Sequence, residues 1–142
     1  MRSVLFDSSV YIAALRREGD AALFFRRLGV EARVWLSAVV LEELYAGADS
    51  RQRWPVERLE QDFERAGRIL VPNLADWAEA GRVLARLGVK YGYEQIGRGR
   101  LTNDALIAMS AARLGITVIT ANRRDFTRLA EFRKFGWEVA TP

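Results

Sequence analysis

Five short apolar runs recur along the chain, and each is too short for a helix but suits a buried strand. They lie at Ser3–Phe6, Val34–Leu36, Ile69–Val71, Ile116–Thr120 and Trp137–Ala140. The stretches between them have apolar residues at helical spacing, with capping residues or glycine near their ends. Strands that alternate with helices favour a mainly parallel sheet covered on both faces. We therefore expect one three-layer α/β/α domain over residues 1–142, with four to five strands.

Polar residues indicate where several of the helices begin and end. Ser8 or Ser9 is expected to cap the first helix, and Ser37 is expected to cap the helix that contains LEELYAG. A further helix is expected over residues 20–28, one from Pro55 to Gly67, and one from Asn73 or Asp76 to Leu87. Residues 88–100 are expected to be a loop or a frayed helix end, and the last helix is expected at Thr127–Lys134.

The segment Leu101–Phe126 combines an alanine-rich helix, a short strand and a polar loop. Asp104 lies in the first turn of that helix, while Asn122 and Asp125 follow the strand. Chemistry in open α/β sheets is found outside the carboxyl ends of parallel strands. The segment therefore predicts a polar site at that edge of the sheet.

Further carboxylates fall on the same predicted edge. Asp7 ends the first strand, although an Asp at this position is also a common helix cap. Glu42 and Glu43 lie in an apolar helix after the second strand, and periodicity does not say which of them faces the site. Several acids at one edge repel each other unless a cation lies among them, and oxygen-only ligands suit Mg²⁺ or Mn²⁺.

Composition excludes several kinds of site. The chain has no Cys and no His, so disulfides, thiolate sites, a His base and His-ligated zinc are all excluded. No apolar run is long enough to span a bilayer, and no signal peptide is expected. We therefore expect a cytoplasmic protein without a membrane partner. The net charge of +4 suggests an anionic partner such as nucleic acid, although an Arg-rich composition also arises from a GC-rich genome.

Three motifs together resemble the PIN domain, specifically the VapC toxin of VapBC toxin–antitoxin pairs. They are FDSSVYIAAL, SAVVLEELYAG, and NDALIAMSAARLG followed by TANRRDF, and in order they cover essentially the whole chain. The resemblance implies a metal-dependent endoribonuclease with Mg²⁺, or Mn²⁺, held by acidic residues. It also implies an RNA substrate, a cognate small antitoxin protein as partner, and a homodimer.

The resemblance also assigns roles to residues of this chain. The expected catalytic and metal-binding acids are Asp7, Glu43, Asp104 and Asp125. The motif E-L-x-x-G selects Glu43 over Glu42. Many relatives have an Asp where this chain has Asn122, so Asp125 is assigned as the fourth acid. The expected supporting groups are Asn122, Ser8 and Thr120, and the expected substrate-binding residues are Arg98, Arg100, Arg123 and Arg124.

Other functions remain open at this point. One is a PIN-type nuclease in RNA processing without an antitoxin. Another is a catalytically inactive PIN fold that binds RNA or protein. This alternative stays open because Asn122 is an amide at a position where an acid is expected. A phosphatase with an Asp nucleophile needs a second acid where Ser9 stands, and the first strand is not followed by G-x-G-x-x-G.

Overall fold

The computed structural model describes residues 1–16, 31–97 and 101–140. Within them, one parallel sheet has the strand order β3-β2-β1-β4-β5. Its strands are β1 (Arg2–Phe6), β2 (Ala32–Ser37), β3 (Ile69–Leu70), β4 (Thr117–Thr120) and β5 (Trp137–Val139). The fold is a three-layer α/β/α domain, as the sequence predicts.

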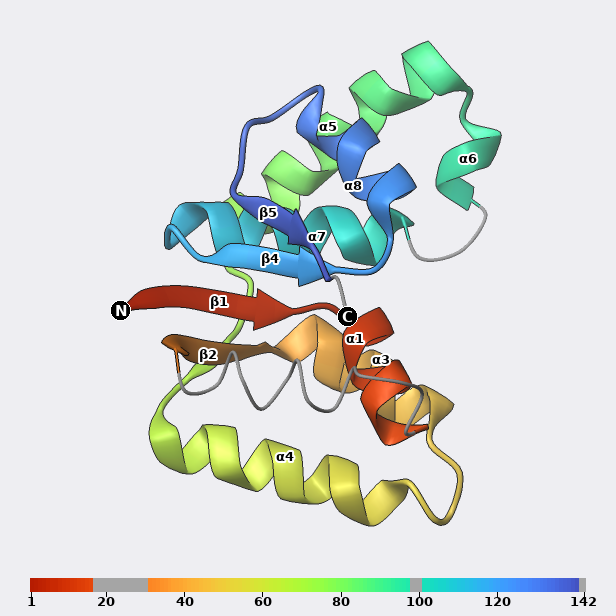
Figure 1. Ribbon diagram of the computed structural model, residues 1–142. Coiled ribbons are helices and arrows are strands. Elements are labelled where there is room, and N and C mark those ends of the chain that lie inside the picture. Colours follow the sequence, from red (N-terminus) through yellow and green to blue (C-terminus); the bar gives the residue numbers. More distant parts are fainter. Residues whose placement is uncertain (17–30, 98–100, 141–142) are drawn as a thin grey trace.

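Helices connect the strands and pack in two groups. The helices of the described residues are α1 (Ser8–Leu15), α3 (Ala38–Gly47), α4 (Arg53–Ala66), α5 (Leu74–Tyr91), α6 (Glu94–Gly97), α7 (Leu101–Arg113) and α8 (Arg123–Ala130). In Figure 1, α5, α7 and α8 pack together beside β4 and β5, whereas α1, α3 and α4 lie together beside β1 and β2. The expected helix at residues 20–28 lies outside the described residues.

The central strand and helix α7 are apolar because they are surrounded by other elements. Val4, Leu5 and Phe6 of β1 have no exposed surface, which explains their unbroken apolar run. Every residue of α7 from Asp104 to Ala111 is buried, so this helix does not have a polar face. Burial of this kind contributes roughly 25 cal/mol per Å² of apolar surface, and it holds the ends of β1 and α7 in fixed positions.

An ion pair fixes α5 against α7. Asp76 closes a capping box with Asn73 at the start of α5 and is only 3% exposed. The Arg113 Nε, at the end of α7, lies 3.0 Å from both carboxylate oxygens of Asp76. Because the backbone N–H of Asn73 also donates to this carboxylate, at 2.9 Å, the buried charge is well satisfied.

Several expected boundaries are wrong, and each error has a local cause. Asp7 caps α1 by accepting a hydrogen bond from the Ser9 N–H, so neither Ser8 nor Ser9 is the cap. Helix α8 begins at Arg123, before the expected Thr127, because Asn122 caps it. Residues 88–97 are largely helical, since α5 continues to Tyr91 and α6 follows it.

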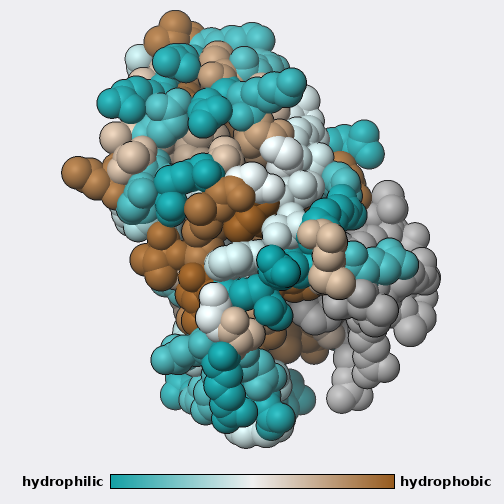
Figure 2. Space-filling model, turned by 90° about the vertical axis from the view of Figure 1, so that its left-hand side faces the viewer, coloured by the Kyte–Doolittle hydropathy of each residue, from teal (hydrophilic) through white to brown (hydrophobic). Residues whose placement is uncertain are grey.

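The face at the amino ends of the strands carries exposed apolar surface. Figure 2 shows an apolar region in the middle of this face, between polar regions above and below it. Separately, the exposed large apolar side chains include Val71, Leu74 and Trp77, which lie in the β3–α5 connection and the first turn of α5. In the described part of the chain, no helix is both long and apolar enough to cross a membrane.

Candidate active site

The candidate site lies where the order of the strands reverses. The chain proceeds outward from β1 through β2 to β3 on one side, and from β4 to β5 on the other. In open α/β sheets, ligands bind outside the carboxyl ends of the strands at such a reversal. Asp7 follows β1, and Asn122 and Asp125 follow β4. The sheet edge predicted from the sequence is thus the one at which these residues meet.

Asp7 is held by two hydroxyl groups. Its side chain is 3% exposed, and its two carboxylate oxygens accept hydrogen bonds from Ser9 Oγ and Thr120 Oγ1. Each hydroxyl in turn accepts a backbone N–H from the loop after β4: Ala121 N donates to Ser9 at 3.1 Å and Asn122 N donates to Thr120 at 2.9 Å. We call Asp7, Ser9 and Thr120 the hydroxyl cradle. It fixes the carboxylate relative to both β1 and β4.

Burial makes ionisation of Asp7 costly. Desolvation raises the pKa of its carboxyl, while the hydrogen bonds from Ser9 and Thr120 lower the pKa and offset part of that effect. A buried carboxylate that is hydrogen-bonded by hydroxyls carries a charge that a nearby cation would stabilise. Raised pKa values of this kind are common at functional sites.

Asn122 lies between the other two acids of this edge. Its Nδ2 donates to Asp125 Oδ2 at 2.8 Å and to Asp104 Oδ2 at 3.4 Å. Its Oδ1 accepts the backbone N–H of Asp125 and so begins α8. Asp104, at the start of α7, is 4% exposed. The amide therefore bridges two carboxylates, whereas an acid in its place would be repelled by both of them.

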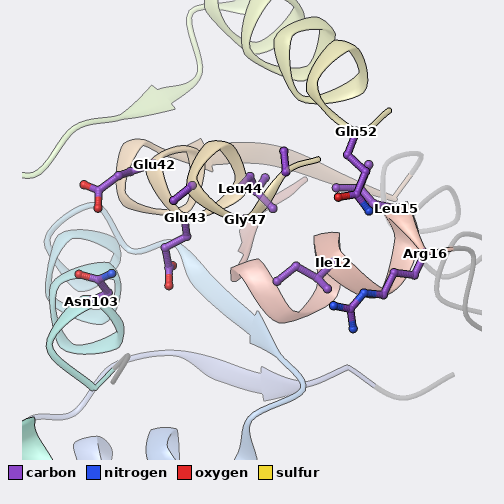
Figure 3. A pocket seen from close by; sticks show the side chains of 11 residues that line it. Ile12, Leu15, Arg16, Glu42, Glu43, Leu44, Gly47, Gln52 and Asn103 are labelled. Atoms are coloured by element: carbon purple, nitrogen blue, oxygen red, sulfur yellow. The ribbon is translucent and has the colours of Figure 1, made fainter. Parts of the chain in front are cut away.

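Glu43 reaches the site from a different helix. It is partly buried on α3, whereas Glu42 beside it is exposed. Both line a groove of about 430 Å³ between α1, α3 and the start of α7, and Figure 3 shows them at the α7 end of this groove near Asn103. Asn103 directly precedes Asp104 in the chain. Glu43 therefore lines a groove that also reaches the first turn of α7, the turn that carries Asp104.

The donor atoms at this edge suit a hard divalent cation. They are carboxylate, amide and hydroxyl oxygens, without the nitrogen or sulfur ligands that zinc prefers. The chemistry of the donor atoms therefore fits Mg²⁺ or Mn²⁺. Their present positions do not yet form a metal site, because no three acidic groups in the described ranges are placed to hold a metal ion together.

The structure places the supporting residues unequally. Thr120 contacts Asp7, as described, while Ser8 is buried in the first turn of α1. The contact to Asp7 comes instead from Ser9, which sequence reasoning did not single out. An Asp followed two residues later by Ser is the spacing of a local side-chain turn, and that signal could have identified Ser9.

The basic residues are only partly described. Arg123 and Arg124 are exposed in the first turn of α8, next to Asn122. Arg98 and Arg100 lie outside the described residues. The start of α8 thus combines two guanidinium groups with the positive end of a helix dipole at the sheet edge.

A model of one protein family matches most of the chain. The family is the PIN domain, and the match spans residues 4–132. No curated protein sequence matches the chain.

Solved structures of toxin–antitoxin complexes resemble the chain over its full length. DNA-bound VapBC from Salmonella typhimurium has a TM-score of 0.70 at 21% identity, covering 98% of each chain. VapBC2 from Rickettsia felis, bound to a promoter DNA fragment, has a TM-score of 0.67 at 21% identity and covers 97% of this chain and 98% of that chain. VapBC-5 from Mycobacterium tuberculosis, a member of the VapBC family of toxin–antitoxin systems, has a TM-score of 0.57 at 26% identity and covers 100% of both chains.

Proposed function

This chain belongs to the PIN domain family, a family of nucleases, and we propose that it is a metal-dependent endoribonuclease acting as the toxin of a type II toxin–antitoxin pair. The observation that carries the proposal is the buried Asp7, held in the hydroxyl cradle at the sheet edge where Asp104 and Asp125 also lie. Desolvation of this carboxylate opposes its ionisation, although the same carboxylate also caps α1. Its burial supports a functional role.

In this proposal, the divalent ion is held by Asp7, Glu43, Asp104 and Asp125. When bound, the ion would supply a Lewis acid that lowers the pKa of a water molecule and offsets charge on a phosphoryl group. The hydroxyl cradle keeps Asp7 in one orientation. The Asn122 amide, which now donates to two carboxylates, can orient a water molecule or a phosphate oxygen by hydrogen bonding.

The rest of the chain supplies the attraction for the substrate. The net charge is +4, and Arg123 and Arg124 are exposed beside the acids, where guanidinium groups can contact phosphates. An RNA substrate in the cytoplasm fits these features. A small antitoxin partner and a homodimer are proposed from the likeness to VapBC complexes.

RNA cleavage with purified protein tests the nuclease proposal. A mixture of structured RNAs is incubated with Mg²⁺, Mn²⁺ or EDTA, using wild type, Asp7→Asn and Asp104→Asn. Asp62→Asn is the matched control, because Asp62 is an exposed acid on α4 that pairs only with Arg58 among the described residues. We expect metal-dependent cleavage by wild type and Asp62→Asn, and its loss in the two site variants.

The opposite outcome is equally informative. If no metal supports cleavage and all four proteins bind RNA equally, the nuclease proposal is wrong and a non-catalytic binding module takes its place. The amide at Asn122, where many relatives carry an acid, is the observation that favours this second candidate.

Expression in a bacterial host tests the toxin proposal separately. Induction of wild type should arrest growth, Asp104→Asn should not, and co-expression of a small neighbouring open reading frame should relieve the arrest. Metal-dependent cleavage in vitro without growth arrest would instead indicate an RNA-processing nuclease.

A further inference from the structure

The groove beside Glu43 extends well beyond the acidic residues. It has a volume of about 430 Å³, within the roughly 300–1,000 Å³ of pockets that bind small ligands. Figure 3 shows two ends: Glu42, Glu43 and Asn103 lie toward α7, whereas Leu15, Arg16 and Gln52 lie toward α1. Of the four proposed metal ligands, Glu43 alone lines this groove, and the α1 end has no role in the metal site.

The α1 end combines an apolar wall with polar groups. Ile12 and Leu15 of α1 and the buried Leu44 of α3 supply the apolar surface. The exposed Arg16 and the half-buried Gln52 supply a cation and an amide. A nucleobase has the matching chemistry, because its faces are apolar while its edge carries hydrogen-bond donors and acceptors.

Both ends belong to one groove, which Glu43 lines at its α7 end. A strand with its phosphate beside Glu43 would extend its neighbouring nucleoside toward the α1 end. An unpaired nucleotide is required, since a base in a duplex cannot present its edge and both faces to such a groove.

We propose that the α1 end of this groove is a nucleotide subsite for single-stranded RNA, and the inference rests on the proposed nuclease function. The base packs against Ile12 and Leu15, the Gln52 amide hydrogen-bonds to its edge, and the Arg16 guanidinium contacts the adjacent phosphate. The subsite selects the base that flanks the scissile phosphate.

Two substitutions test the subsite, one by removing a polar group and the other by filling the groove. Gln52→Ala removes the amide, and its matched control is Gln61→Ala, an exposed Gln on α4 outside the groove. Gly47→Leu fills the groove, because a Cβ at Gly47 meets no atom within 4 Å, and Gly47→Ala is the smaller control. Thermal unfolding of each variant checks that the fold is intact.

The assay is cleavage of a randomised single-stranded RNA library, with the bases on both sides of each cut read by sequencing. We expect wild type to prefer certain bases at one flanking position. Gln52→Ala should weaken that preference about fivefold or more, as expected for one lost hydrogen-bonding partner of a base. Gly47→Leu should lower kcat/KM on the library, whereas Gln61→Ala and Gly47→Ala should behave as wild type.

Two other outcomes would overturn the subsite. Cleavage with an unchanged base profile and rate in both groove variants overturns the subsite while leaving the nuclease intact. The subsite is also overturned if those variants cut RNA normally but escape inhibition by a co-expressed antitoxin, because the groove then binds a peptide.

If wild type cuts no RNA, the proposed function fails and binding of a fluorescein-labelled ribo-oligonucleotide decides the subsite. Weaker binding by Gln52→Ala than by Gln61→Ala supports it, and equal binding overturns it.

Discussion

Replacing Thr120 with Val isolates the hydroxyl cradle, because Val keeps the shape of Thr and removes only the hydroxyl group. Thr120 is fully buried, so no water replaces the lost group. The hydroxyl donates to Asp7 and accepts the Asn122 N–H at 2.9 Å. A hydrogen bond to a charged group contributes about 1.5–3 kcal/mol and a neutral one about 1 kcal/mol. We expect Thr120→Val to lower the free energy of unfolding by about 3 kcal/mol.

The expected change in melting temperature follows from the size of the domain. For 142 residues at roughly 2.1 cal/mol/K per residue, the unfolding entropy is about 0.3 kcal/mol/K. Thr120→Val should therefore lower Tm by about 10 °C. Thermal and urea unfolding in EDTA at pH 7 measure this loss without metal.

A double-mutant cycle with Asp7→Asn separates the bond to Asp7 from other effects. In the Asp7→Asn background the Thr120 hydroxyl bonds to a neutral amide, so its removal should cost about 1 kcal/mol less than in wild type. A coupling energy below about 0.3 kcal/mol would be within ordinary additivity and would refute the charge-assisted cradle.

The pH dependence of this cycle has a definite sign. Because the pKa of Asp7 is raised in the folded protein, the folded state binds its proton more tightly than the unfolded state. That contribution to stability is fully present below the unfolded pKa and is lost as the pH rises through the folded pKa. Asp7→Asn cannot lose it, so its stability relative to wild type should increase from acidic to neutral pH.

Three further substitutions test other parts of the structure. Asn122→Asp puts a third carboxylate between Asp104 and Asp125, so it should destabilise the metal-free protein by about 1–2 kcal/mol. Mg²⁺ should stabilise this variant more than it stabilises wild type. Equal stability of the variant and wild type in EDTA would contradict this prediction. Arg113→Met leaves the buried Asp76 without its cation. Because Arg113 is partly exposed, we expect urea unfolding to show a loss of about 2 kcal/mol in the free energy of unfolding, rather than the roughly 3–5 kcal/mol of a fully buried pair. A loss under about 0.5 kcal/mol would mean that solvent replaces the ion pair. The hydrogen bond to Glu60 raises the pKa of Tyr45 to about 12, so an ultraviolet titration of Glu60→Gln should show one tyrosine ionising at lower pH than in wild type, and an unchanged titration would argue against the bond.

The sheet was predictable because its strands are buried on both faces and therefore read as short apolar runs. The buried Val4, Leu5 and Phe6 illustrate the pattern. The end of β3 was also close: the prediction ended this strand at Val71, just before Pro72, and the structure ends it at Leu70. The start of α8 was missed because Asn122 and the two following arginines have the composition of a loop, although Asn is a good N-cap.

The position of the site followed from strand ends, but its contacts did not. Ser8 and Ser9 are adjacent and chemically identical, and only the helix turn that begins at Asp7 decides which hydroxyl reaches the carboxylate. The bond from Thr120 to Asp7 depends on the pairing of β1 with β4. Neither the order of these strands nor their register is encoded locally, so sequence patterns alone could not reveal the cradle.

The cradle also sets the time at which the site can form during synthesis. Asp7 and Thr120 are separated by 113 positions, and β1 pairs with β4 through the same long-range closure. As the chain emerges from the ribosome, Asp7 is exposed long before its second hydroxyl partner exists. The edge that gathers the acids is assembled only after β4 has been translated. Under the proposed function, a nascent chain therefore cannot cleave the messenger RNA that encodes it until most of the domain has been made.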